Sequence, residues 1–122
     1  MIVDSENGSC NVNAGWAERI SVYCDNGDLT ASIDAAVPQT GSGFATGNGS
    51  VELLLPPDGV FSVQAQALAG GVVLVEDAPA GCVLATASEG SKTLSCNGAT
   101  DQDPVYVAVA DGTSLADVVL RF

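Results

Sequence analysis

The stretch GFATGNGSVELLL, residues 43–55, decides the fold of this chain. Its centre is Asn48-Gly49, a dipeptide that favours tight turns, and alternating apolar residues stand on both sides of it. Aligned on the glycine, the same pattern occurs six times in 122 residues, at spacings of 19, 22, 21, 20 and 22. Such a period predicts supersecondary units stacked on a shared core. The six turn glycines are Gly8, Gly27, Gly49, Gly70, Gly90 and Gly112.

Each copy also alternates apolar and polar side chains around its glycine. The period is two, as in half-buried strands, and the parity changes at the glycine, so a turn there keeps both arms on one core. We expect Glu52 to face solvent and the sixth copy to shift by one residue or bulge after Gly112, where Leu115 and Val118 leave the pattern. The positions expected to face the core include Val22, Phe44, Ala65, Val107 and Val109 before the glycines, and Leu29, Val51, Leu53, Leu55, Val72 and Leu74 after them.

Two all-β architectures fit this pattern. The first is a β-solenoid, a single-stranded β-helix-like stack of about six coils with a period of about 21 residues. The second is a β-sandwich in which each Asn-Gly turn closes a hairpin. The regular period favours the solenoid, whereas the hairpin chemistry and the proline-containing links favour the sandwich. In both cases residues 1–122 form a single β-repeat domain.

The charge of the chain limits its partners. Three basic and fifteen acidic residues give a net charge of −12, and nucleic acid needs several Lys or Arg contacts to its phosphates, so we expect no nucleic-acid partner. No apolar run approaches the roughly 20 residues of a membrane span. The N-terminal sequence MIVDSENGS lacks the basic flank and apolar segment of a signal peptide. We therefore expect either a cytosolic protein or an exported one whose signal segment is absent from this chain.

The four cysteines indicate export. Cys10 and Cys24 are 14 residues apart, and so are Cys82 and Cys96. Without a CxxC pair or any histidine, they make a poor zinc site, and two disulfides are favoured. Four cysteines allow three pairings, of which the equal spacing favours Cys10–Cys24 and Cys82–Cys96. Disulfides persist in oxidising compartments, so we expect an extracellular or cell-surface location.

Residues 43–73, GFATGNGSVELLLPPDGVFSVQAQALAGGVV, resemble the bacterial adhesin-like family of β-strand-repeat proteins of unknown function. That family repeats a T-G-N/S-G-S/D-V-x-L phrase followed by L-P and a later F-x-V/L-x-A. The residues that match are 46–51, 55–56 and 61–65, and 24–29 echo the first phrase. The resemblance covers roughly residues 21–75 and implies a right-handed β-solenoid at a cell surface or outside the cell. It carries over no catalytic residue.

Catalytic chemistry has little to build on in this sequence. The chain has no histidine, which excludes Ser/His/Asp and Cys/His arrangements. Glu52, Glu76 and Glu89 occupy different phases of the repeat and have no accompanying aromatic platform for a sugar. We therefore expect no enzymatic activity.

Calcium is the one cofactor that the sequence suggests. Asp25 and Asp28, and Asp101 and Asp103, place carboxylates in two turns, and hard oxygen ligands suit this ion. Neither group has the spacing of an EF-hand or of a calcium β-roll, and aspartate is also an ordinary turn residue. The two readings, calcium ligands or turn formers without a cofactor, stay open.

These observations favour a non-enzymatic extracellular or cell-surface domain with a structural or adhesin-like role. One alternative is a self-assembling subunit of an extracellular filament or surface layer, because strand residues run close to both ends of the chain without an evident cap. Another is a calcium- or glycan-binding module. The expected partners are a second copy of the chain or a component of a cell surface or matrix.

Overall fold

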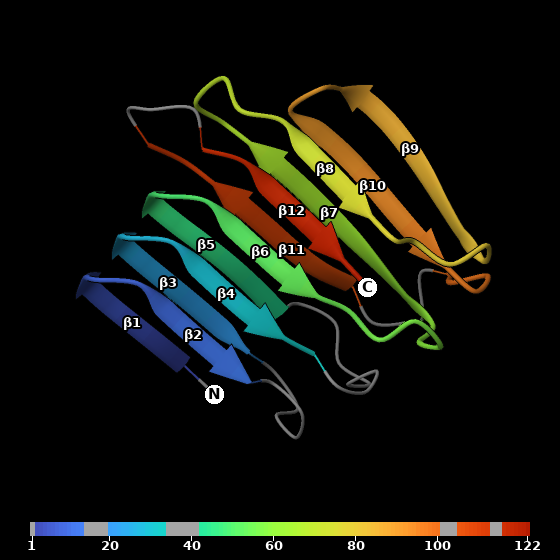
Figure 1. Ribbon diagram of the computed structural model, residues 1–122, viewed down its shortest axis with the longest axis horizontal. Coiled ribbons are helices and arrows are strands. Elements are labelled where there is room, and N and C mark those ends of the chain that lie inside the picture. The colour runs from blue at the N-terminus through green and yellow to red at the C-terminus, as the bar shows by residue number, and fades with distance from the viewer. Residues whose placement is uncertain (1, 14–19, 34–41, 101–104, 113–115) are drawn as a thin grey trace.

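The computed structural model describes residues 2–13, 20–33, 42–100, 105–112 and 116–122, and this part of the chain is all β (Figure 1). Its strands lie in two facing sheets. The strands are β1 (Ile2–Asn7), β2 (Cys10–Asn13), β3 (Ser21–Asn26), β4 (Leu29–Ser32), β5 (Ser42–Asn48), β6 (Val51–Leu54), β7 (Phe61–Ala67), β8 (Val73–Glu76), β9 (Cys82–Ser88), β10 (Ser91–Cys96), β11 (Val105–Ala110) and β12 (Val118–Arg121).

Most neighbouring strands are parallel. Sheet A has the order β1-β3-β5-β11-β7-β10-β9, and sheet B has the order β2-β4-β6-β12-β8. All of sheet B and the first five strands of sheet A are parallel, whereas β10 is antiparallel to both β7 and β9. In five of the six repeats the strand before the turn lies in sheet A and the strand after it lies in sheet B (Figure 1). Each of these five repeats therefore forms one coil of the chain.

The coils do not stack in the order of the sequence. The fifth repeat, β9 and β10, is an antiparallel hairpin within sheet A, as the sandwich alternative required of every copy. The sixth repeat, β11 and β12, lies between the third and the fourth. The all-β prediction is confirmed, but a regular stack of six successive coils is not what the sheet order shows.

The composition of β11 explains its central position. Its sequence VYVAVA has no charge and no proline, the features that protect an edge strand from pairing, so it suits a strand with neighbours on both sides. Tyr106, Ala108 and Ala110 are buried, and Val107 and Val109 lie half-buried on the opposite face. The expectation that Val107 and Val109 face the core is therefore wrong, because the repeat alignment placed them in the wrong phase.

The first three copies follow the expected phase. Val51, Leu53 and Leu55 are buried and Glu52 is half-buried on the outer face of sheet B. In the fourth copy Val73 is buried, whereas Val72 is only half-buried and Leu74 is 43% exposed. The phase expected for Val72 and Leu74 is wrong because Gly71, rather than Gly70, takes the stacked turn position.

The sixth copy deviates further than expected. Val118 lies opposite both Val51 and Val73 in sheet B. Val51 is two residues after Gly49, but Val118 is six residues after Gly112, so this copy has four extra residues at its turn. The residue that corresponds to Gly49 is therefore Ala116, and the predicted shift of one residue after Gly112 is too small.

This phase predicts different costs for two leucines of sheet B. Leu53 is fully buried, so we expect Leu53→Ala to lower the free energy of unfolding by about 2–5 kcal/mol. Leu74 is 43% exposed on β8, and we expect Leu74→Ala to cost less than about 1 kcal/mol. Chemical denaturation of both variants measures the difference. Equal losses would show that the inner and outer faces of sheet B are wrongly assigned.

Candidate functional site

The turns between the two sheets carry an asparagine ladder. Asn7, Asn26 and Asn48 end β1, β3 and β5 and lie opposite one another in register. The Asn26 side chain donates to the Asn7 side-chain oxygen at 3.4 Å, and that of Asn48 donates to Asn26 at 2.9 Å. Asn26 also donates to the Glu6 carbonyl at 3.1 Å. The Asn-Gly pairs therefore bind neighbouring coils to one another, beyond their role in bending each coil.

Two of the glycines that follow these asparagines, Gly27 and Gly49, are required by the close approach of the coils. A Cβ atom on Gly27 would overlap the Gly8 carbonyl oxygen, and one on Gly49 would overlap that of Gly27. At these two positions only a residue without a side chain fits. Of the predicted turn glycines, Gly8, Gly27 and Gly49 occupy this position, whereas Gly70 and Gly112 precede it and Gly90 turns the β9–β10 hairpin.

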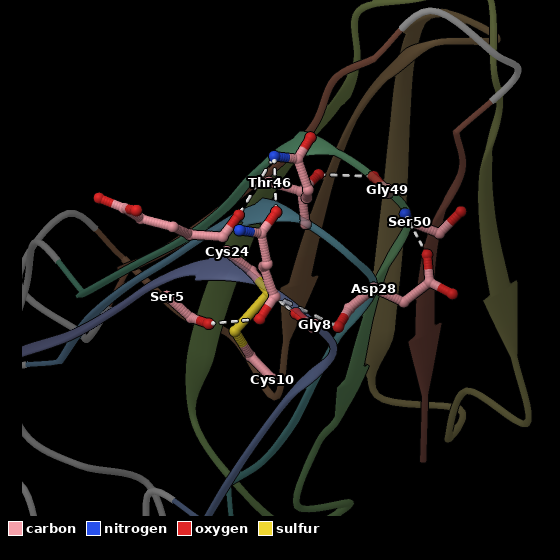
Figure 2. The surroundings of a disulfide bond; sticks show 11 residues. Ser5, Gly8, Cys10, Cys24, Asp28, Thr46, Gly49 and Ser50 are labelled. Carbon is pink, nitrogen blue, oxygen red and sulfur yellow. Dashed lines mark hydrogen bonds between the residues drawn. A yellow bond between two sulfur atoms is a disulfide. The ribbon is translucent and has the colours of Figure 1, made fainter.

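A second ladder follows the residue after each turn. Asp28 Oδ1 accepts from the backbone N–H of Ser50 at 2.9 Å. Ser50 Oγ accepts from Asp117 N–H at 3.1 Å, and Asp117 Oδ1 accepts from Val72 N–H at 2.9 Å. Each side chain thus accepts from the next coil of the stack, and Figure 2 shows the step from Asp28 to Ser50. The sequence signal for this ladder is the polar residue directly after an aligned glycine, as in Gly27-Asp28 and Gly49-Ser50.

The two predicted disulfides are present. Cys10–Cys24 joins β2 of sheet B to β3 of sheet A beside the Gly8 turn, so it links the first coil to the second through the core (Figure 2). Cys82–Cys96 joins β9 to β10. Each joins one edge strand, β2 or β9, to a strand that has neighbours on both sides. Closing loops of this size contributes roughly 2–4 kcal/mol each, and two disulfides are consistent with an oxidising, extracellular environment.

The predicted calcium ligands are placed only in part. Asp25 Oδ1 accepts from the Tyr23 hydroxyl at 3.4 Å, and Asp28 belongs to the turn ladder. Within the described ranges, no three acidic or cysteine side chains come close enough to hold a metal ion. Asp101 and Asp103 lie outside the described residues. A calcium site therefore stays a prediction, and the contacts of Asp28 match the turn-former reading.

Glu52 and Glu76 both contact the same arginine on the outer face of sheet B. Arg121, on the central strand β12, contacts Glu52 of β6 at 3.0 Å and Glu76 of β8 at 2.9 Å. All three side chains are about one-third to one-half exposed, so the pairs contribute modestly to stability. Glu89 lies elsewhere, in the β9–β10 turn, where its carbonyl accepts from Val73 N–H at 2.9 Å.

Among the described residues, the outer face of sheet A has one exposed aromatic side chain, Tyr23, beside small residues of β5. On β5, Gly43, Ala45 and Gly47 face outward, and a Cβ on Gly47 would lie 2.7 Å from the Tyr23 hydroxyl. Tyr23 on β3 is 42% exposed. Desolvation, and then the charge of Asp25, raise the pKa of the Tyr23 hydroxyl above its usual value, so it stays a neutral donor at physiological pH.

No protein-family model matches this chain, and neither the curated proteins nor the solved structures include one that is significantly similar to it. In the described part of the chain, no helix is long and apolar enough to cross a membrane.

The close approach of neighbouring turns predicts different stability losses for alanine at Gly49, in the turn, and at Gly43, on β5. In Gly49→Ala the new methyl group would overlap the Gly27 carbonyl, so we expect a loss of about 1–3 kcal/mol in unfolding free energy. The matched control is Gly43→Ala, whose methyl group would meet nothing within 4 Å and whose backbone is extended. Thermal melts of the two variants measure the effect. If Gly43→Ala proved the more harmful, the close stacking of the turns would be contradicted.

Proposed function

We propose that this chain is a non-enzymatic structural or adhesin-like domain that acts outside the cell or at its surface. The observation that carries the proposal is a two-sheet stack whose polar turn residues hold neighbouring coils together by hydrogen bonds. The resemblance of residues 21–75 to β-strand-repeat adhesins favours the same role, and so does the coil-like path of five of the six repeats. The two disulfides suit an oxidising environment.

Rigidity suits a domain that presents a surface rather than one that closes on a substrate. The asparagine ladder, the Asp28–Ser50–Asp117 ladder and the Arg121 ion pairs all join successive strands across the stack. A preorganised surface loses little conformational entropy when a partner binds. The mechanism that follows is recognition by shape and polarity, without a reaction.

The surface that we assign to the partner is the outer face of sheet A around Tyr23. Its ring stands beside the shallow strip of Gly43, Ala45 and Gly47, and Val107 lies one strand further on. Exposed tyrosine is a frequent anchor of protein interfaces because it combines a large apolar ring with a hydroxyl group. A sheet face of glycine and alanine beside one aromatic ring suits an extended polymer or a protein surface better than a small molecule, because small-molecule sites are concave.

A binding array tests the proposal. The labelled chain is applied to immobilised matrix proteins and cell-surface polysaccharides, and we expect at least one component to be bound. Tyr23→Ala should weaken that binding by about tenfold or more. Thr30→Ala, on β4 at the outer face of sheet B and outside the assigned face, should leave it unchanged. Binding that is insensitive to Tyr23→Ala would contradict the assigned face, and a silent array would contradict the adhesive role.

The second candidate is a self-assembling subunit, which the ends of the stack favour. In sheet A, among the described strands, β1 pairs only with β3 and β9 pairs only with β10. A strand with one neighbour offers unpaired N–H and C=O groups to another chain. This candidate predicts association of the purified chain, whereas the adhesive role alone does not.

A further inference from the structure

Among the strands at the ends of the two sheets, β9 is the one that lacks the usual protection against pairing. β2 and β8 have four residues each, and the N–H of Val73 on β8 is already bonded to Glu89. β1 carries Asp4 and Glu6, whose charges oppose pairing with another acidic chain. β9 has seven residues, CVLATAS, with no charge and no proline.

The side chains of β9 are exposed on both of its faces. Val83 is 69% exposed and Leu84 is 42% exposed. Leu84 lies opposite Leu94, which lies opposite Val63, so its side chain points to the inner side of sheet A. Leu94 and Val63 are buried, but Leu84 is not, because sheet A extends beyond sheet B by the β9–β10 hairpin (Figure 1).

We propose that β9 pairs with β9 of a second copy of this chain, antiparallel and across a twofold axis, so that sheet A continues from one subunit into the other. A twofold axis normal to the sheet reverses the strand direction and keeps the inner side inner. Leu84 of each copy then lies close to that of the other on the inner side of the joined sheet. The contact is isologous, so association closes at two.

The distribution of charge favours a second copy at this edge. The whole chain has a net charge of −12, which opposes contact between two copies almost everywhere. The two hairpin strands carry a single charge, the cation Lys92, and the turn between them adds Glu89. Repulsion between two copies is therefore smallest where the backbone edge is exposed. Added sodium chloride screens the remaining acidic residues and strengthens the dimer.

This inference rests on the second candidate function, the self-assembling subunit. It specifies that the assembly is a closed dimer and not an open filament. The dimer would carry two outer faces of sheet A, each with its Tyr23, so a weak surface contact would gain avidity. The adhesive role does not depend on the dimer. Tyr23→Ala tests surface binding and leaves β9 intact, so the failure of one proposal can be told from the failure of the other.

Sedimentation velocity of the full, disulfide-bonded chain, from micromolar to millimolar concentration, tests the dimer. We expect a monomer–dimer equilibrium in the parent chain. Leu84→Asp and Leu84→Lys should each raise the dimer dissociation constant by about 30-fold or more, because each places two like charges near the axis. The lysine variant lowers the net negative charge, so its effect cannot come from added overall repulsion. The matched control is Leu74→Asp on β8, since Leu74 is 43% exposed and outside the contact; it should dimerise like the parent.

Hydrogen exchange of the parent chain provides a measurement that needs no variant. Raising the protein concentration should slow amide exchange in β9 and leave β1 and β8 unchanged. A chain that stays monomeric at every concentration would overturn the proposal. So would open-ended growth, a dimer that survives both Leu84 variants, or a dimer that Leu74→Asp disrupts. If a Leu84 variant fails to fold, the exchange pattern decides: protection outside β9 overturns the pairing, and protection within β9 supports it.

Discussion

The close stacking of the turns is the contact on which the rest of this structure depends. Backbone hydrogen bonds continue through the turns without a break: Gly27 N–H donates to Asn48 and Leu29 N–H donates to Ser50, at 3.0 and 2.9 Å. This continuity requires neighbouring turns to approach so closely that the turn glycines of the second and third coils, Gly27 and Gly49, have no room for a side chain. Once the turns are in register, the inward-facing side chains of both sheets are in register as well.

The order of the coils depends on which strands can have a neighbour on each side. β11 carries no charge or proline that would protect an edge, and it pairs with β5 on one side and β7 on the other. Its partner β12 places Arg121 between Glu52 and Glu76, so the same repeat also joins the two halves of sheet B by ion pairs. The last repeat therefore holds the third and fourth repeats together, and each disulfide secures a part of the stack that has fewer neighbours.

The sequence allowed the strand type, the turn chemistry and both disulfide pairings to be predicted, because each depends on local patterns. The period-two alternation around Gly49 placed Val51 and Leu53 correctly. It failed at Leu74, where a Gly-Gly turn adds one residue, and at Val107, where an apolar run on both faces hides the phase. The order of the coils could not be read from the period, since a repeat records which units are alike and not which of them are neighbours.

The residues of the candidate surface can be read from the sequence, but their arrangement in space cannot. Tyr23, Gly43 and Gly47 are visible in the sequence, but their proximity depends on the parallel pairing of β3 with β5. The edge character of β9 was equally hidden, because its sequence resembles the first arm of every other repeat. Both surfaces arise from the position of a strand in its sheet, and this position is set by long-range pairing.

Nuclear Overhauser contacts across sheet B test the central claim, that the last repeat lies between the third and the fourth. Neighbouring strands lie about 4.8 Å apart, and strands separated by one other strand lie about twice as far apart. The structure predicts backbone contacts from Val118 to both Val51 and Val73, and none between Val51 and Val73. Direct contacts between Val51 and Val73 would mean that the repeats stack in the order of the sequence, and would contradict the account.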